Sequence, residues 1–162
     1  MIKIAERVKR LKETISSVCA RVGREPAEVK LVVVTKSASQ EAIEEVLKLG
    51  LNELGENRVQ QLKKVVTDVD EFIGRNAGEA AIPRKVTWHM IGHLQRNKVR
   101  QVLPLVSLIH SVDTLRLAEE INPPLFAGPK VRVQLGTGER ECDDDHFRIR
   151  LNNNFCQRSE AK

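Results

Sequence analysis

The sequence predicts an α/β fold built on a parallel sheet. Short apolar runs typical of buried strands alternate with amphipathic segments along the first 135 residues. The run at 31–34 is Leu-Val-Val-Val, and its three β-branched residues favour a strand. Such alternation indicates either an open doubly wound sheet or a barrel. Neither a G-x-G-x-x-G fingerprint nor a P-loop occurs, so nothing points to a dinucleotide or nucleotide-triphosphate site.

The individual elements follow from apolar periodicity and from chain breakers. Residues 3–22 carry apolar side chains at steps of three and four, which is one face of a helix, and Gly23 is a typical stop. Ser37 and Gln40 have the capping-box spacing, and Asp113 is a candidate N-cap. We therefore expect strands at 30–36, 52–57, 86–91, 105–112 and 131–135, and further helices at 38–49, 57–73, 94–103 and 113–121.

The chain divides into two parts of different character. Pro123 and Pro124 break the last expected helix, and beyond Gly136 the sequence becomes charged and rich in asparagine. We expect residues 1–135 to form a partial (β/α) domain with an N-terminal helix. We expect residues 136–162 to be a divergent tail with little order.

Composition favours a globular protein in a reducing compartment. Hydrophobic residues make up 41% and charged residues 30%, and the net charge of +5 comes from basic residues interleaved with acidic ones. The three cysteines are scattered, which argues against a disulfide framework and predicts a cytoplasmic location. No apolar run approaches the length of a membrane span, and no secretory signal is expected at the N-terminus.

Two binding classes find little support. Aromatic residues make up only 3%, so stacking of single-stranded bases is not expected, although a basic helix over 96–100 leaves a nucleic-acid or protein-binding module as the weakest alternative. The acidic run at 143–145, followed by His146, could suggest a metal site. Adjacent acids do not converge on one ion without a turn, and we expect no metal.

Candidate site residues lie at the expected carboxyl ends of the strands, where ligands bind in parallel α/β folds. Lys36 ends the first strand. It could form an imine with an aldehyde, since an amine with a lowered pKa is a nucleophile, or it could simply reach solvent from a strand end. The other positions at this edge are Thr35, Gly55, Glu56, Asn57, His89, Gly92, Ser111 and Asp113.

Two of these residues carry open alternatives. Asn57 could hydrogen-bond a hydroxyl on a bound ring, or it could cap the following helix. His89 could stack on a ligand or hydrogen-bond to it, or it could be a satisfied histidine within its strand, which the pattern favours slightly. No Ser/His/Asp set or pair of carboxylates appears, so hydrolase chemistry is weakly supported.

Three motifs resemble a known family. They are Val-Val-Thr-Lys36-Ser, then Leu54-Gly55-Glu56-Asn57 with Gln60, and then Trp88-His89-Met90-Ile91-Gly92-His93-Leu94-Gln95-Arg96-Asn97-Lys98. In this order and over residues 1–122 they resemble the pyridoxal phosphate homeostasis proteins, and the Ser111-Val112-Asp113 segment also matches. The third motif is the most specific of the set.

The resemblance implies a barrel and a cofactor. The family fold is a (β/α)₈ barrel of the TIM type, related to the N-terminal domain of alanine racemase, and we expect about five strand–helix units of it here. Family members hold pyridoxal 5′-phosphate (PLP) as a Schiff base on the lysine that matches Lys36. The resemblance makes Lys36, Asn57 and His89 the expected cofactor-binding residues, with no catalytic residue and no metal.

The implied function is intracellular vitamin B6 homeostasis by a carrier or regulator of the cofactor. Possible recipients are PLP-dependent apoenzymes, and the exposed edge of an incomplete barrel predicts oligomers. Two alternatives remain open: a PLP-dependent racemase-like enzyme and a truncated family member without function. The chain contains no tyrosine, so the tyrosine of alanine racemases has no counterpart. The family's C-terminal phosphate-gripping loops, one Ser-Met-Gly-Met-Ser-like and one Arg-Ile-Gly-like, also lack a counterpart.

Overall fold

The computed structural model describes residues 3–121 and 132–135, and the strands of this part form one parallel sheet. The strands are β1 (Val33–Val34), β2 (Glu53–Glu56), β3 (Thr87–Met90), β4 (Leu108–Val112) and β5 (Arg132–Leu135). Their order across the sheet is β1-β2-β3-β4-β5, so every strand lies beside its successor in the sequence. A doubly wound sheet would reverse direction at a switch point, whereas this continuous order is that of a (β/α) barrel.

The predicted fold class is therefore confirmed, and so is its incomplete form within the described residues. β1 pairs only with β2 and β5 only with β4, so the described sheet is open at both edges. The 136–162 tail, the double proline and the 143–146 run lie outside the described residues.

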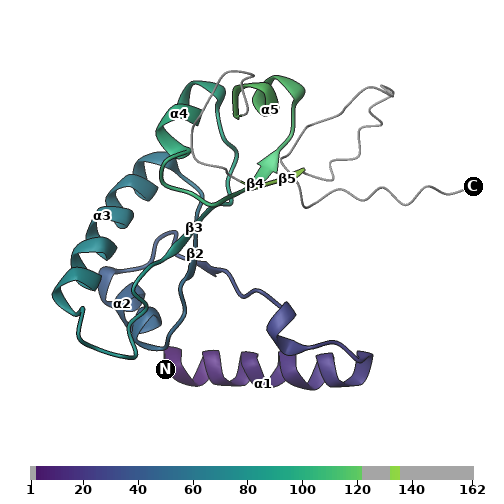
Figure 1. Cartoon of the computed structure of the whole chain (residues 1–162), viewed down its shortest axis with the longest axis vertical. Coiled ribbons are helices and arrows are strands. Elements are labelled where there is room, and N and C mark those ends of the chain that lie inside the picture. The colour runs from purple at the N-terminus through teal and green to yellow at the C-terminus, as the bar shows by residue number, and fades with distance from the viewer. Residues whose placement is uncertain (1–2, 122–131, 136–162) are drawn as a thin grey trace, which may run out of the picture.

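Helices follow the strands in alternation. They are α1 (Ile4–Val22), α2 (Gln40–Lys48), α3 (Val59–Arg75), α4 (Val99–Val102) and α5 (Leu115–Ile121), with 3-10 turns η1 (Pro26–Glu28) and η2 (Arg96–Lys98). Figure 1 shows α2, α3 and α4 along one side of the sheet, with α1 crossing near one end of it. No helix in the described part of the chain is long and apolar enough to cross a membrane.

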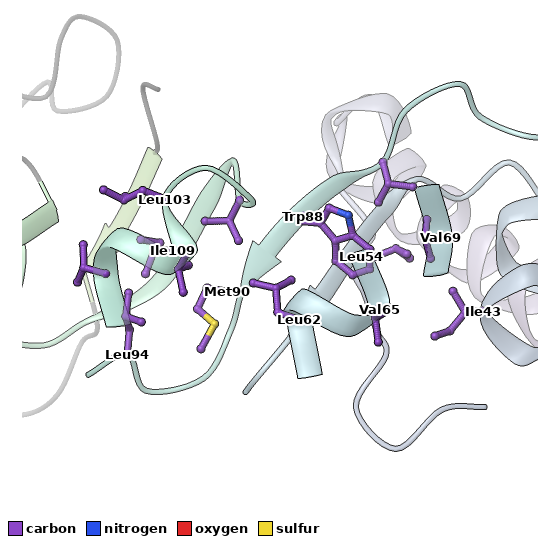
Figure 2. Packing of buried hydrophobic residues seen from close by; sticks show 14 of the residues in the cluster. Ile43, Leu54, Leu62, Val65, Val69, Trp88, Met90, Leu94, Leu103 and Ile109 are labelled. Carbon is purple, nitrogen blue, oxygen red and sulfur yellow. The ribbon is translucent and has the colours of Figure 1, made fainter. Parts of the chain in front are cut away.

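The hydrophobic core lies between the sheet and the helices of that side. Leu54 of β2 and Trp88 of β3 meet α3 residues such as Leu62, and all three are at most 4% exposed (Figure 2). Successive side chains of a strand point to opposite faces. The alternate strand positions, Val34, Glu53, Gly55, His89 and His110, therefore lie on the opposite face, which we call the inner face.

α1 is the amphipathic helix that the periodicity predicts, but little of its apolar face is covered. It packs against α2 and η1, and Cys19 is its only buried residue. Leu11, Val18 and Val22 are between 41% and 68% exposed. Gly23 ends the helix in the left-handed conformation, as predicted.

Several predicted boundaries and caps are wrong. β1 contains two residues instead of the expected seven, because among the described residues its ladder with β2 includes only Val33 and Val34. Ser39, not Ser37, caps α2, since its hydroxyl accepts from the Ala42 N–H at 3.3 Å. The Thr114 hydroxyl, not Asp113, accepts from the first turn of α5. The basic helix is shorter than 94–103 and consists of η2 and α4.

Candidate functional site

Lys36 lies in a tight turn directly after β1. The Ala38 N–H donates to the Thr35 carbonyl at 2.9 Å, so Lys36 and Ser37 are the two central residues of the turn. Ser37 has a φ of 61°, the sign that a type II turn requires at this position. The Lys36 side chain is exposed at the carboxyl edge of the sheet. Exposure fits a lysine that reaches solvent from a strand end, and imine formation with an aldehyde stays a prediction.

A buried carboxylate joins this turn to the next strand end. Glu56 ends β2 and is fully buried. Its Oε1 accepts from the Thr35 hydroxyl at 2.6 Å, and its Oε2 accepts from the Asn57 N–H at 3.3 Å. The Glu56 carboxylate thereby links Thr35, the residue before Lys36, with the backbone of Asn57.

Asn57 is half-buried and does not cap α3. The N-cap position is Arg58, which makes no side-chain cap bond. The capping alternative for Asn57 is therefore wrong. Asn57 directly follows β2 at the carboxyl edge of the sheet, and its contact with a ligand stays a prediction.

The loop after β3 packs directly on Asn57. A Cβ placed on Gly92 would lie 2.3 Å from the Asn57 carbonyl oxygen, so only glycine allows this approach. The Ser111 hydroxyl donates to the Gly92 carbonyl at 2.6 Å. The ends of β1, β2, β3 and β4 are thus connected in one continuous set of contacts, and the sequence prediction that these ends meet is confirmed.

His89 lies deeper than the sequence indicates. It is the third residue of β3 rather than its end, and it is fully buried on the inner face. Its Nδ1 is 2.8 Å from His110 Nε2, and its Nε2 is 2.5 Å from Glu53 Oε2. Both ring nitrogens have partners, as the alternative of a satisfied strand histidine predicts.

Glu53 is the centre of this polar chain. Its other carboxylate oxygen accepts from Lys30 Nζ at 2.8 Å. Burial raises the pKa of Glu53, but the hydrogen bonds that it accepts from Lys30 and His89, together with the positive charge of Lys30, lower it more, so the net pKa shift is downward. A charged, paired carboxylate is therefore the stable state of Glu53 at neutral pH.

Sequence reasoning missed the roles of Lys30, Glu53 and His110. A charged residue at the start of β2 and a histidine within β4 are the only local signals, and without the strand register nothing shows that they meet at His89. Asp113 lies in an exposed pair with His93, whose Nδ1 is 3.2 Å away. No cluster that could hold a metal ion occurs among the residues that the structure describes.

Comparison with curated proteins finds relatives that share the same name. The pyridoxal phosphate homeostasis protein of Aquifex aeolicus is 38% identical to this chain over 139 residues, which cover 84% of the chain and 56% of the relative. The protein of the same name from Pseudomonas aeruginosa is 33% identical over 136 residues, covering 83% of the chain and 54% of the relative. No family model matches the chain.

A solved structure supports the same relationship at the level of fold. The crystal structure of an unknown protein from Bifidobacterium adolescentis is 32% identical, with a TM-score of 0.63, and the match covers 75% of this chain and 51% of that one. The resemblance that the three motifs predict is therefore confirmed. The chain is a homologue of the pyridoxal phosphate homeostasis proteins, and it spans about half the length of the curated relatives that it matches.

Proposed function

We propose that the chain binds PLP covalently through Lys36 and serves in the homeostasis of this cofactor. The observation that carries the proposal is the exposed Lys36 at the carboxyl edge of the sheet, in a chain that is 38% and 33% identical to relatives named for pyridoxal phosphate homeostasis. The Nζ amine of Lys36 attacks the aldehyde carbon, a C=N bond forms, and the aldehyde oxygen leaves as water. Bound in this way, the cofactor can later be released to another amine.

The described residues fit the lysine side of such a site. Lys36 is accessible, so an aldehyde in solution can reach its amine. Asn57 is half-buried at the adjacent strand end and can donate to a ring hydroxyl through its amide. His89 enters the proposal differently from the sequence prediction, because both of its nitrogens are already bonded within the inner face. We propose that His89 instead holds β2 and β3 together below the site, through its hydrogen bond to Glu53.

The test is the absorbance of the purified chain at the edge of the visible range after incubation with PLP. We expect a new band in the parent chain, its loss in Lys36→Ala, and its retention in Lys85→Ala, a matched removal of another exposed lysine. Borohydride reduction followed by mass spectrometry should place the reduced adduct on Lys36. Absence of the band in the parent chain, or an adduct confined to other lysines, would reject the proposal.

Two further proposals concern partners. A cofactor carrier needs recipients, and we propose PLP-dependent apoenzymes in the cytoplasm. Loaded chain mixed with an apoenzyme should restore activity faster than the same concentration of free PLP, and equal rates would contradict a carrier role.

We also propose that the chain associates through the open edge of β1. Val34 is 46% exposed there, and within the part of the chain that the structure describes β1 pairs with β2 alone. Sedimentation should show oligomers that dissociate in Val34→Lys, because a charge on an edge strand disfavours pairing. A monomer of the parent chain at all concentrations would exclude this association.

A further inference from the structure

We propose that Glu56 is a positioning residue, whose buried carboxylate holds the Lys36 turn and Asn57 in one fixed arrangement for the cofactor. The inference rests on the proposed function, because it concerns the same site. It adds a residue that does not itself contact the cofactor and acts through its two neighbours.

Each carboxylate oxygen of Glu56 accepts a hydrogen bond from a different residue. Oε1 accepts a hydrogen bond from the Thr35 hydroxyl, with the two oxygens 2.6 Å apart, and Thr35 is the residue that starts the Lys36 turn. Oε2 receives the backbone N–H of Asn57 at 3.3 Å. One planar group therefore connects the side chain of Thr35, the residue before Lys36, with the backbone of Asn57.

The Thr35 hydroxyl contributes a second link. It also lies 3.2 Å from the Gly55 carbonyl oxygen, and the Thr35 N–H donates to the same carbonyl at 3.0 Å. Thr35 is 2% exposed. The turn is thus held on a buried anchor, while its central residue Lys36 remains exposed.

The presence of a carboxyl group at this buried position points to the two hydrogen bonds that it accepts. Within the described residues no Lys, Arg or His lies within ion-pair distance of this carboxylate. A buried carboxylate without a cation is costly, and an apolar side chain would fill the same space at lower cost. What the carboxylate supplies, and an apolar side chain cannot, is acceptance of two hydrogen bonds from the two segments that carry the site.

Thr35→Val is the sharpest test, because it removes the hydroxyl with little change of shape, and Thr35→Ser restores the hydroxyl. Val65→Ala serves as a matched control, since it loosens the core at α3 without touching the strand ends. Two measurements are made. The first is hydrogen exchange of the Asn57 and Ala38 amides in the cofactor-free chain, and the second is the rate at which the absorbance band forms after PLP is added.

We expect Thr35→Val and Glu56→Gln to speed exchange of the Asn57 amide and to slow band formation by about tenfold or more, as displacement of a reacting group does. We expect Thr35→Ser to react within about twofold of the parent chain. An unchanged rate in Thr35→Val, or an equal loss in Val65→Ala, would overturn the inference. If the parent chain forms no band, the proposed function fails. Hydrogen exchange of the Asn57 amide then tests by itself whether Glu56 connects Thr35 with Asn57, and unchanged protection of this amide in Thr35→Val would reject that connection.

Discussion

His89 of β3 and His110 of β4 are joined by one hydrogen bond across the inner face, with Nδ1 and Nε2 2.8 Å apart. Only one proton can lie between these two nitrogens. His89 Nε2 faces the Glu53 carboxylate, which can only accept, so the neutral His89 ring carries its proton there. His89 Nδ1 is then the acceptor and His110 Nε2 the donor. The chain from Lys30 through Glu53 and His89 to His110 therefore has a single direction of donation at each step, and it ties β2, β3 and β4 together.

Replacement of His89 should destabilise the fold. In His89→Leu the half-buried Glu53 and His110 each lose one hydrogen bond, and loss of two hydrogen bonds costs about 1–3 kcal/mol. The free energy of unfolding, measured with urea, should fall by that amount. His93→Gln is the control because His93 is exposed, and it should change stability by less than about 0.5 kcal/mol. Equal stability of the two variants would show that the chain of hydrogen bonds is of no energetic importance.

Stability should decline in acid through Glu53. Its pKa lies below the ordinary value of 4.5, so the folded state binds the proton less readily than the unfolded state. The stabilising contribution of Glu53 is fully present above that ordinary value and is lost as the pH falls through the lowered pKa. Titration of the unfolding free energy from about pH 7 to about pH 3 should give a shallower decline in Glu53→Gln than in the parent chain. Glu13→Gln, which alters an exposed carboxyl, should keep the decline of the parent chain. A Glu53→Gln profile parallel to that of the parent would contradict the assignment.

The order of elements was predictable from the sequence, since each strand and helix has its own apolar period. α3 and β3 fall within two residues of their expected bounds because breakers and long apolar faces mark their ends. The predicted length of β1 was wrong because strand length depends on pairing with neighbouring strands, which no local pattern reveals. The predicted N-cap of α2 was wrong because serine is an equally good N-cap at positions 37 and 39. The turn that contains Lys36 includes Ser37 and leaves Ser39 as the cap.

The site was predictable only where residues are neighbours in the chain. Lys36 and Asn57 lie at the strand ends where their motifs place them, but the depth of His89 depends on the register of β2 against β3. Gly55 pairs with His89, so the histidine lies below the edge that Asn57 occupies. A shift of register by two residues would have placed it at the edge, and the sequence contains no signal that excludes such a shift.

Gly92→Ala should damage the site and Gly74→Ala should not. A methyl group at Gly92 would meet the backbone of Asn57 at 2.3 Å, which neither loop can avoid without moving. We expect a loss of about 1–3 kcal/mol in unfolding free energy, as for other overpacked positions, together with slower formation of the PLP band. Gly74 lies in α3 with nothing within 4 Å of the added methyl group, so alanine there should stabilise the chain by about 0.5–1 kcal/mol. A Gly92→Ala chain as stable as the parent would show that the two loops do not pack as described.

Ser37→Gly should be tolerated and Ser37→Val should not. The φ of 61° at Ser37 is free of strain for glycine and costs other residues about 1–2 kcal/mol, most of all β-branched ones. Because the turn from Thr35 to Ala38 holds Lys36, we expect Ser37→Val to lower the unfolding free energy by at least about 1 kcal/mol and to slow band formation with PLP. Ser37→Gly should retain or slightly raise stability, since relief of strain opposes the greater freedom of glycine in the unfolded chain. Ser39→Gly separates the turn from the helix cap: it should cost only a few tenths of a kcal/mol and leave the rate of band formation unchanged. If Ser37→Val behaves like Ser39→Gly in both measurements, the left-handed turn has no part in presenting Lys36.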